Sequence, residues 1–196
     1  MATIIGSSVK ESIATDYLQL PDEALLAQCQ VNAYKASGPG GQHRNKVSSA
    51  IRLYHPPTGV TAICNDSRNQ HQNKRVAVQR LRAKIACQVR RPVELAHPAV
   101  GETVASCIFA PKLSRSAQRD EQAQAKRLQV GRRDHRYWAV VQFLLDLLEA
   151  CGGRLAEAAE LLGISTSNFT SVLRDDHAAF AAAAEIRKRH GHGPLK

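Results

Sequence analysis

Two short runs of alternating apolar and polar side chains, at residues 50–55 and 60–64, constrain the fold most strongly. Residues 56–59 between them read Pro-Pro-Thr-Gly and predict a tight turn, because Pro presets φ and Gly accepts a positive φ. Residues 29–35 also alternate and predict a further strand. Over residues 69–90 the period becomes helical, with one apolar stripe formed by Val78, Leu81, Ile85 and Val89. These patterns predict a small α+β unit with a β-hairpin, about three strands in all and one long amphipathic helix packed on the sheet.

A glycine-rich loop, residues 37–46, joins the first two predicted strands. Gly40 and Gly41 allow the backbone to approach a crowded partner, because glycine has no side chain to clash. Gln42 follows them with two donors and one acceptor and does not titrate. Residues 35–91 carry twelve basic residues and one acidic residue, whereas the whole chain has a net charge of +10. A neutral amide on a strongly basic unit favours delivery to RNA or DNA over a self-contained hydrolase.

Composition and periodicity divide the chain into four segments. Residues 1–26 form a lead-in, residues 27–91 the α+β unit, residues 92–136 a basic linker and residues 137–196 an all-helical domain. The linker has eight basic and five acidic residues, and its polar second half, residues 114–136, predicts a solvated helix. The predicted fold class is therefore α+β, followed by a partly helical linker and an all-α C-terminal domain.

The helical domain contains the pattern of a helix-turn-helix. Apolar residues at helical spacing precede Gly163, and Ser165 or Thr166 then provides an N-cap for a second helix. A helix that reads DNA presents polar and basic side chains outward. The outward candidates are Thr166, Ser167, Asn168, Thr170, Ser171 and Arg174. Because residues 137–196 carry six basic and seven acidic groups, RNA docking, protein docking and a structural role stay open beside DNA binding.

The sequence offers no pattern for a metal, a cofactor or a membrane partner. The five cysteines form no Cys-x-x-Cys pair and the eight histidines show no ligand spacing, so we expect no metal and no cofactor. No apolar run approaches the roughly 20 residues that a bilayer requires. The lead-in is acidic and lacks the basic start of a secretory signal. We therefore expect a cytoplasmic protein with reduced cysteines.

Three blocks of this sequence resemble class I peptide chain release factors. Residues 37–42 read Ser-Gly-Pro-Gly-Gly-Gln and are followed by Asn45-Lys46, as in the Gly-Gly-Gln loop of that family. The resemblance continues through residues 50–60. It resumes at Arg68-Asn69-Gln70 with Asn73-Lys74, where the family usually has Arg-Ser-Gln followed by Asn-Lys. The resemblance covers roughly residues 28–90, and the three blocks identify the chain as a member of this family.

The resemblance implies an enzyme, a ribosome-dependent peptidyl-tRNA hydrolase of the release-factor type. The implied catalytic residues are Gly40, Gly41 and Gln42, on a loop that enters the peptidyl transferase centre. The resemblance further implies that the backbone N–H of Gln42 stabilises the developing oxyanion and the departing ribose oxygen, and that its side chain shapes the pocket for water. In the family this glutamine is often N-methylated. No Ser-His-Asp set is needed, and we expect His43 and His55 to be non-catalytic.

Eight basic residues are candidates for contacts with rRNA and tRNA phosphates. They are Arg44, Lys46, Arg52, Arg68, Lys74, Arg75, Arg132 and Arg133. A solvated basic face is the alternative for each of them. The implied partners are the ribosome, through the rRNA of its large subunit, and peptidyl-tRNA, with an accessory rescue factor as a further candidate. We expect the protein to be a monomer.

The chain departs from full-length release factors before its glycine loop. Only 39 residues precede Gly40, and no codon-reading segment is visible among them, so we expect no stop-codon specificity. Short relatives of this kind act in ribosome rescue, and we expect codon-independent peptidyl-tRNA hydrolysis on the ribosome. Two alternatives stay open. One is a non-catalytic RNA- or DNA-binding regulator that uses the basic unit and the helix-turn-helix, and the other is an esterase that acts off the ribosome.

Overall fold

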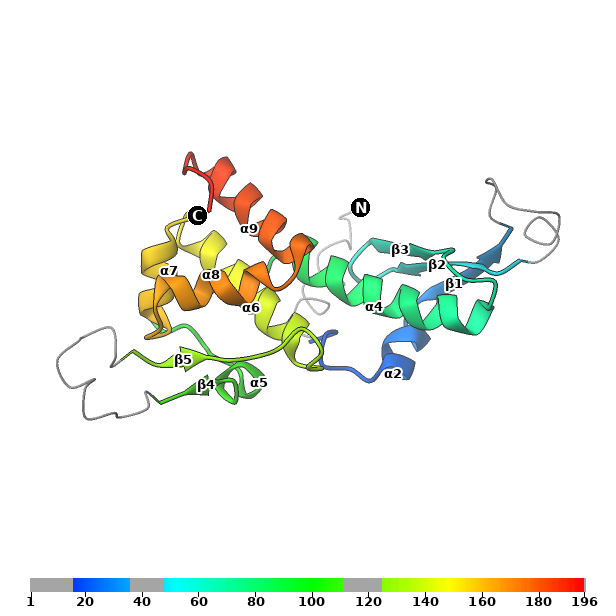
Figure 1. The fold of residues 1–196 in the computed structure, drawn as a ribbon, viewed down its shortest axis with the longest axis horizontal. Coiled ribbons are helices and arrows are strands. Elements are labelled where there is room, and N and C mark those ends of the chain that lie inside the picture. Colours follow the sequence, from blue (N-terminus) through cyan, green and yellow to red (C-terminus); the bar gives the residue numbers. More distant parts are fainter. Residues whose placement is uncertain (1–15, 36–47, 111–124, 196) are drawn as a thin grey trace, which may run out of the picture. The chain divides into compact units, whose positions relative to one another are not determined.

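The computed structural model describes residues 16–35, 48–110 and 125–195. The chain forms two compact units, Met1–Ile85 and Ala86–Lys196, and helix α4 (Gln70–Gln88) begins in the first and ends in the second (Figure 1). No helix in the described part of the chain is long and apolar enough to cross a membrane. The boundaries of the four segments proposed from the sequence stay predictions.

The first unit contains an antiparallel sheet of three strands in the order β1-β2-β3. Strands β1 (Gln30–Tyr34), β2 (Ala50–His55) and β3 (Val60–Cys64) form where the alternating runs predict them. In the turn between β2 and β3, Gly59 has φ +68° and its N–H donates to the carbonyl of His55 at 2.9 Å. The turn needs glycine there, because other residues rarely adopt this conformation. The predicted α+β unit with three strands and a long helix is confirmed.

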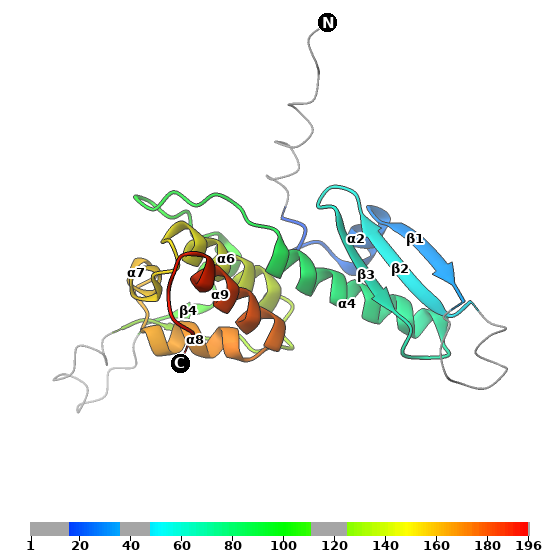
Figure 2. The ribbon, with the colours of Figure 1, turned by 90° about the horizontal axis from the view of Figure 1, so that it is seen from above.

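The two faces of this sheet differ in burial on β2 and β3, whereas the edge strand β1 is mostly exposed on both faces. On β2, Ile51, Leu53 and His55 are buried, whereas Arg52 and Tyr54 point to the opposite face and are exposed. The buried face shares its core with Leu81 and Ile85 of α4, which runs along the sheet (Figure 2). Leu25 of the short helix α2 (Asp22–Ala27) is also fully buried. The helices therefore cover one face, each large apolar side chain contributing about 1.5–3 kcal/mol by burial, and leave the other face open.

The second unit is mainly helical. Its elements in chain order are α5 (Glu102–Ala105), the antiparallel strand pair β4 (Ile108–Phe109) and β5 (Arg127–Leu128), and the helices α6 (Tyr137–Ala150), α7 (Leu155–Leu161), α8 (Thr166–Arg174) and α9 (His177–Arg189). Helix α6 is apolar nearly all round and lies buried, as that pattern predicts. Helices α8 and α9 pack against it and against each other.

The solvated helix expected over residues 114–136 is wrong in the part that the structure describes. Residues 125–136 form strand β5 and turns instead. Leu128 is 1% exposed and pairs with Ile108 across the strands. The side-chain amide of Asn168 on α8 donates to the carbonyl of Leu128 at 2.9 Å and accepts its N–H at 2.7 Å. This tertiary contact, invisible to local periodicity, favours the extended backbone over the helix.

A buried carboxylate lies on α6. Asp146 is 2% exposed and accepts hydrogen bonds from the guanidinium of Arg90 at 2.8 Å and from the backbone N–H of Arg91 at 3.2 Å. Gln142 on the same helix donates to the carbonyl of Val89 at 3.2 Å. Burial raises the pKa of Asp146 to about 6, although both arginines lower it. The residues just after α4 are thus fixed to α6 by polar contacts.

Candidate nucleic-acid interface

The loop predicted to carry the chemistry lies outside the described residues. Its predicted site residues are Gly40, Gly41, Gln42, Arg44 and Lys46, all within residues 36–47. The structure does describe the base of this loop. On one side the loop leaves β1 after Tyr34, and on the other it returns into β2 at Ala50, which pairs with Tyr34. The closing pair of an antiparallel ladder therefore fixes the two ends of the loop.

Asn73, on the second turn of α4, ties this base to the helix. Its side chain is 0% exposed and donates to the carbonyls of Ser49 and Ser67, both at 2.7 Å. Its amide oxygen accepts the N–H of Ser67 at 2.9 Å and the Cys64 thiol at 3.4 Å. One buried amide thus joins the chain just after the loop, the end of β3 and the start of α4. The sequence resemblance included Asn73 but gave it no role, because its partners are distant in sequence.

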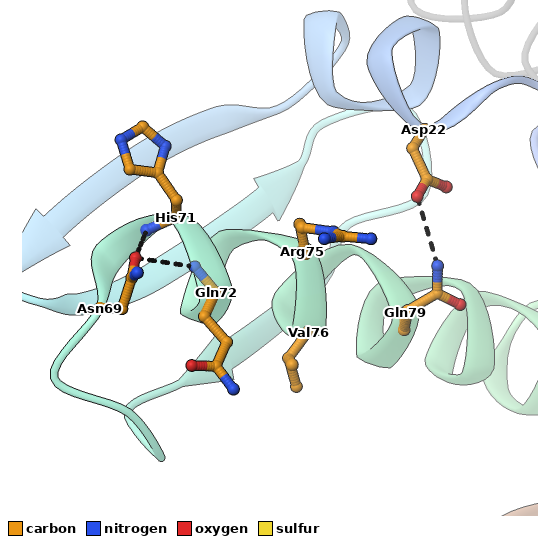
Figure 3. Close-up of a pocket in the computed structure, with 7 residues that line it drawn as sticks. All are labelled: Asp22, Asn69, His71, Gln72, Arg75, Val76 and Gln79. Atoms are coloured by element: carbon orange, nitrogen blue, oxygen red, sulfur yellow. Dashed lines mark hydrogen bonds between the residues drawn. The ribbon is translucent and has the colours of Figure 1, made fainter.

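The first turn of α4 makes a second contact with the loop base. Gln70 donates from Nε2 to the carbonyl of Ser48 at 3.2 Å. Asn69 caps the helix, since its side-chain oxygen accepts the N–H groups of His71 at 2.9 Å and Gln72 at 3.2 Å (Figure 3). The cap fixes where α4 begins, and so fixes the positions of Gln70 and Asn73 relative to the loop.

Four of the predicted RNA-binding residues lie in the first unit within the described residues. Arg52 is exposed on the open face of the sheet, with its guanidinium carbon 5.4 Å from the ring centroid of Tyr34. Arg68 and Arg75 are exposed and Lys74 is half-buried, all just before or within the first two turns of α4. None of these four forms an ion pair with another described residue, unlike Arg80, which pairs with Asp66 at 2.6 Å. The cluster at the start of α4 keeps its charge available to an anion.

A groove of about 610 Å³ runs beside this cluster along α4. It is lined by Asp22, Asn69, His71, Gln72, Arg75, Val76 and Gln79. Figure 3 shows Arg75 extending along the helix surface and Gln79 bonded to Asp22 of α2, at 3.3 Å. Asp22 also accepts from the buried Arg82 at 2.7 Å. The groove therefore presents amides, a guanidinium and the imidazole of His71, and the carboxylate of Asp22 already accepts hydrogen bonds from α4.

Arg132 and Arg133 belong to the second unit, whereas Arg52, Arg68, Lys74 and Arg75 belong to the first. Both are exposed. Arg132 forms an ion pair with Asp176 at 2.9 Å. Asp176 also caps α9 by accepting the N–H of Ala178 at 2.8 Å. Of these two arginines, Arg132 therefore has a partner within its own unit.

The segment predicted as a helix-turn-helix consists of α7, a turn at Gly163 with φ +64°, and α8. Two of its outward candidates are committed elsewhere: Asn168 to Leu128, and the buried Thr170 to the carbonyl of Thr166 at 2.9 Å. Thr166, Ser167, Ser171 and Arg174 remain exposed, and Arg174 lies over the Phe180 ring at 5.7 Å. The face of α8 offers three hydroxyls and one cation. A DNA-reading role stays a prediction.

His55 has the surroundings of a structural residue. It is 0% exposed, and its Nδ1 lies 2.8 Å from the Thr58 hydroxyl in the turn that follows β2. Its ring meets that of Tyr17 edge-on, with centroids 4.8 Å apart. Burial lowers the pKa of His55, which favours the neutral ring. Within the described residues, no three His, Cys, Asp or Glu side chains gather as a metal site.

The RF-1 domain family matches residues 23–136 of the chain. Peptide chain release factor 1 of Variovorax paradoxus (strain S110) is 49% identical over 70 residues, which are 33% of this chain and 19% of that protein. Peptide chain release factor 2 of Acidovorax sp. (strain JS42) is 54% identical over 56 residues, 29% of this chain and 15% of that protein. Peptide chain release factor 1 of Delftia acidovorans (strain DSM 14801 / SPH-1) is 33% identical over 135 residues, 68% of this chain and 35% of that protein.

The chain thus spans between 15% and 35% of the length of these curated relatives. The domain match extends beyond residues 28–90, where the three sequence blocks lie, and includes residues 92–136. It begins at α2 and covers the sheet, α4 and the strand pair of the second unit. Because this match covers more than half of its residues, the chain belongs to the RF-1 domain family of class I peptide chain release factors.

Proposed function

We propose that this protein hydrolyses the ester bond of peptidyl-tRNA on the ribosome, without reading a codon, using the loop that carries Gly40, Gly41 and Gln42. The observation that carries the proposal is the anchoring of the loop base. The Tyr34–Ala50 pair closes one side, and Asn73 and Gln70 hold the backbone at Ser49 and Ser48 on the other. A base held in this way suits a loop that must present a backbone N–H to a reacting carbonyl with little freedom.

The charge of the first unit supports an RNA partner. Arg68, Lys74 and Arg75 gather where α4 begins, next to the loop base, and form no ion pairs among the described residues. We propose that they contact phosphates of rRNA or tRNA, together with Arg44 and Lys46 of the loop. Phosphate contacts of this kind anchor a protein on RNA and make its binding weaken with salt.

Each group in the reaction has a proposed role. Gly40 and Gly41 permit close approach of the backbone, the N–H of Gln42 stabilises the oxyanion, and the side chain of Gln42 positions the attacking water. No general base is assigned, because positioning and preorganised donors each contribute several kcal/mol to such a reaction. The ribosome supplies the rest of the site.

The test is release of labelled peptide from stalled 70S complexes that lack a stop codon. We expect the wild type to release the peptide and Gln42→Ala to lose release while it still binds the ribosome. Gln88→Ala is the matched control, because Gln88 is an exposed glutamine at the end of α4. Salt-sensitive ribosome binding without any release would contradict the proposal. That result would favour the binding-only regulator, and hydrolysis of free peptidyl-tRNA would favour the off-ribosome esterase.

A further inference from the structure

The open face of the three-stranded sheet has the composition of a base-stacking surface. The strand register places the same-face neighbours Gln30 with Tyr54 and Thr61, Asn32 with Arg52 and Ile63, and Tyr34 with Ala50. Tyr54 is 37% and Ile63 39% exposed, and Arg52 is exposed between them. Isolated apolar side chains at a surface need no explanation, but here they adjoin one another on neighbouring strands.

Arg52 stands between two tyrosines on this face. Its guanidinium carbon lies 5.4 Å from the ring centroid of Tyr34, within the range of a cation–π contact. Tyr54 is two residues further along the same strand, so it projects from the same face about 7 Å away. Planar groups that are exposed and partly fixed by their neighbours lose little conformational freedom when a flat ligand stacks on them.

The charge on this face selects the ligand. The three strands contain no Asp or Glu, and the nearby Asp66 is paired with Arg80 at 2.6 Å. Arg80 and Lys84 of α4 also donate to the carbonyls of Ile63 and Thr61, at 2.9 Å each, so cations border strand β3. A protein partner would find few charges to pair with on the face itself, whereas a nucleic acid brings both bases for the rings and phosphates for the cations.

The geometry points to the open sheet face, defined by Tyr34, Arg52, Tyr54 and Ile63, as a binding site for unpaired RNA nucleotides, whose bases stack on Tyr54 and on the Tyr34–Arg52 pair. Single strands are favoured over duplexes because a duplex hides the flat faces of its bases within the stack. The site differs from the groove beside α4, which is lined by amides, a cation and the imidazole of His71 but by no tyrosine. The choice of RNA over DNA rests on the proposed function, whereas the stacking geometry does not.

The test measures binding of a short fluorescein-labelled oligouridylate to the full chain by fluorescence anisotropy. We expect Tyr54→Ala to weaken binding about five- to hundredfold, the range for loss of one stacked base, and Tyr54→Phe to bind within about twofold of the wild type. Phe109→Ala removes a ring that is 49% exposed in the other unit and is the matched control, expected to have no effect. Arg52→Gln should also lower the salt dependence of binding, unlike Tyr54→Ala.

Unchanged binding in Tyr54→Ala, or binding of an RNA duplex as tight as that of the single strand, would overturn the inference. The peptide-release assay distinguishes a failure of the stacking site from a failure of the proposed function. Gln42→Ala should bind the oligouridylate like the wild type. If release depends on Gln42 but oligouridylate binding ignores Tyr54, only the stacking site is wrong. If binding depends on Tyr54 but no release occurs, only the hydrolase assignment is wrong.

Discussion

Removal of the Asn73 side chain should loosen the base of the Gly-Gly-Gln loop. Asn73 is 0% exposed and makes three strong hydrogen bonds, two at 2.7 Å and one at 2.9 Å, to the backbone at Ser49 and Ser67. A net contribution of about 1 kcal/mol for each bond gives about 3 kcal/mol. The partners left without a hydrogen bond add to this loss where water does not reach them. We expect Asn73→Ala to lower the unfolding free energy of the first unit by about 3–4 kcal/mol.

The measurement must report on the first unit alone. The only tryptophan, Trp138, lies in the second unit, so its fluorescence does not report on the sheet. Amide hydrogen exchange of β2 and β3, followed by mass spectrometry, gives the opening free energy of the first unit directly. Asn65→Ala is the matched control, since Asn65 is exposed in the loop after β3 and should change stability by less than about 0.5 kcal/mol.

Asn73→Asp sharpens the same test. The carboxylate keeps the shape of the amide and accepts the N–H of Ser67, but it cannot donate to the carbonyls of Ser49 and Ser67. We expect a loss at neutral pH at least as large as that in Asn73→Ala. A loss below about 1 kcal/mol in both variants, or an equal loss in Asn65→Ala, would refute the role of Asn73 as the link between loop base and helix.

Two further predictions concern the second unit. Burial raises the pKa of Asp146 to about 6, against about 4 for an unfolded carboxyl. The folded protein therefore binds this proton more tightly than the unfolded chain does. The stabilisation that results is fully present below about pH 4 and is lost as the pH rises through about 6. Urea unfolding followed by Trp138 fluorescence should show that the free energy of unfolding declines by up to about 3 kcal/mol over this pH range. Asp146→Asn should abolish the decline. A free energy of unfolding that rises with pH would contradict the assignment. Asn168→Ala should speed hydrogen exchange at Leu128 at least tenfold, with exchange in α6 unchanged, because Asn168 makes both hydrogen bonds to that residue. Equal protection in the variant would show that the strand pair holds Leu128 without help from α8.

Local periodicity predicts the elements in which the order of apolar and polar residues along the element itself separates a buried face from an exposed one. Strands β2 and β3 begin and end at the predicted residues, because their alternation separates a buried face from an open one. Helix α4 occupies residues 70–88 of the predicted 69–90, since Asn69 serves as its cap and not as its first residue. The same reasoning fails at Leu128, whose sequence neighbours Arg127 and Gln129 are polar and whose partner Asn168 lies 40 residues away.

The candidate site shows a similar division. Residue types and the family resemblance predict Gly40, Gly41 and Gln42 and the basic residues around α4 as the site. The three loop residues lie outside the described residues, and the roles of the whole set stay predictions. Asn73 carries no charge and has no unusual neighbours in sequence, and its importance lies in contacts with Ser49, which is 24 residues distant. Only the fold brings those groups together.

At the start of α4, the side chains that hold the loop base differ from those that line the groove, although both sets lie in one basic segment of the sequence. Asn73 and Gln70 donate hydrogen bonds to backbone carbonyls at the loop base, on the side of α4 that faces the sheet and the loop. Arg75 lines the groove, where its guanidinium can meet a phosphate without disturbing those bonds. In the proposed function, neutral amides therefore set the geometry of the loop base and the cations set the affinity for RNA. Salt should weaken the contribution of the cations and leave that of the amides intact, because hydrogen bonds between neutral groups have no net charge for ions to screen.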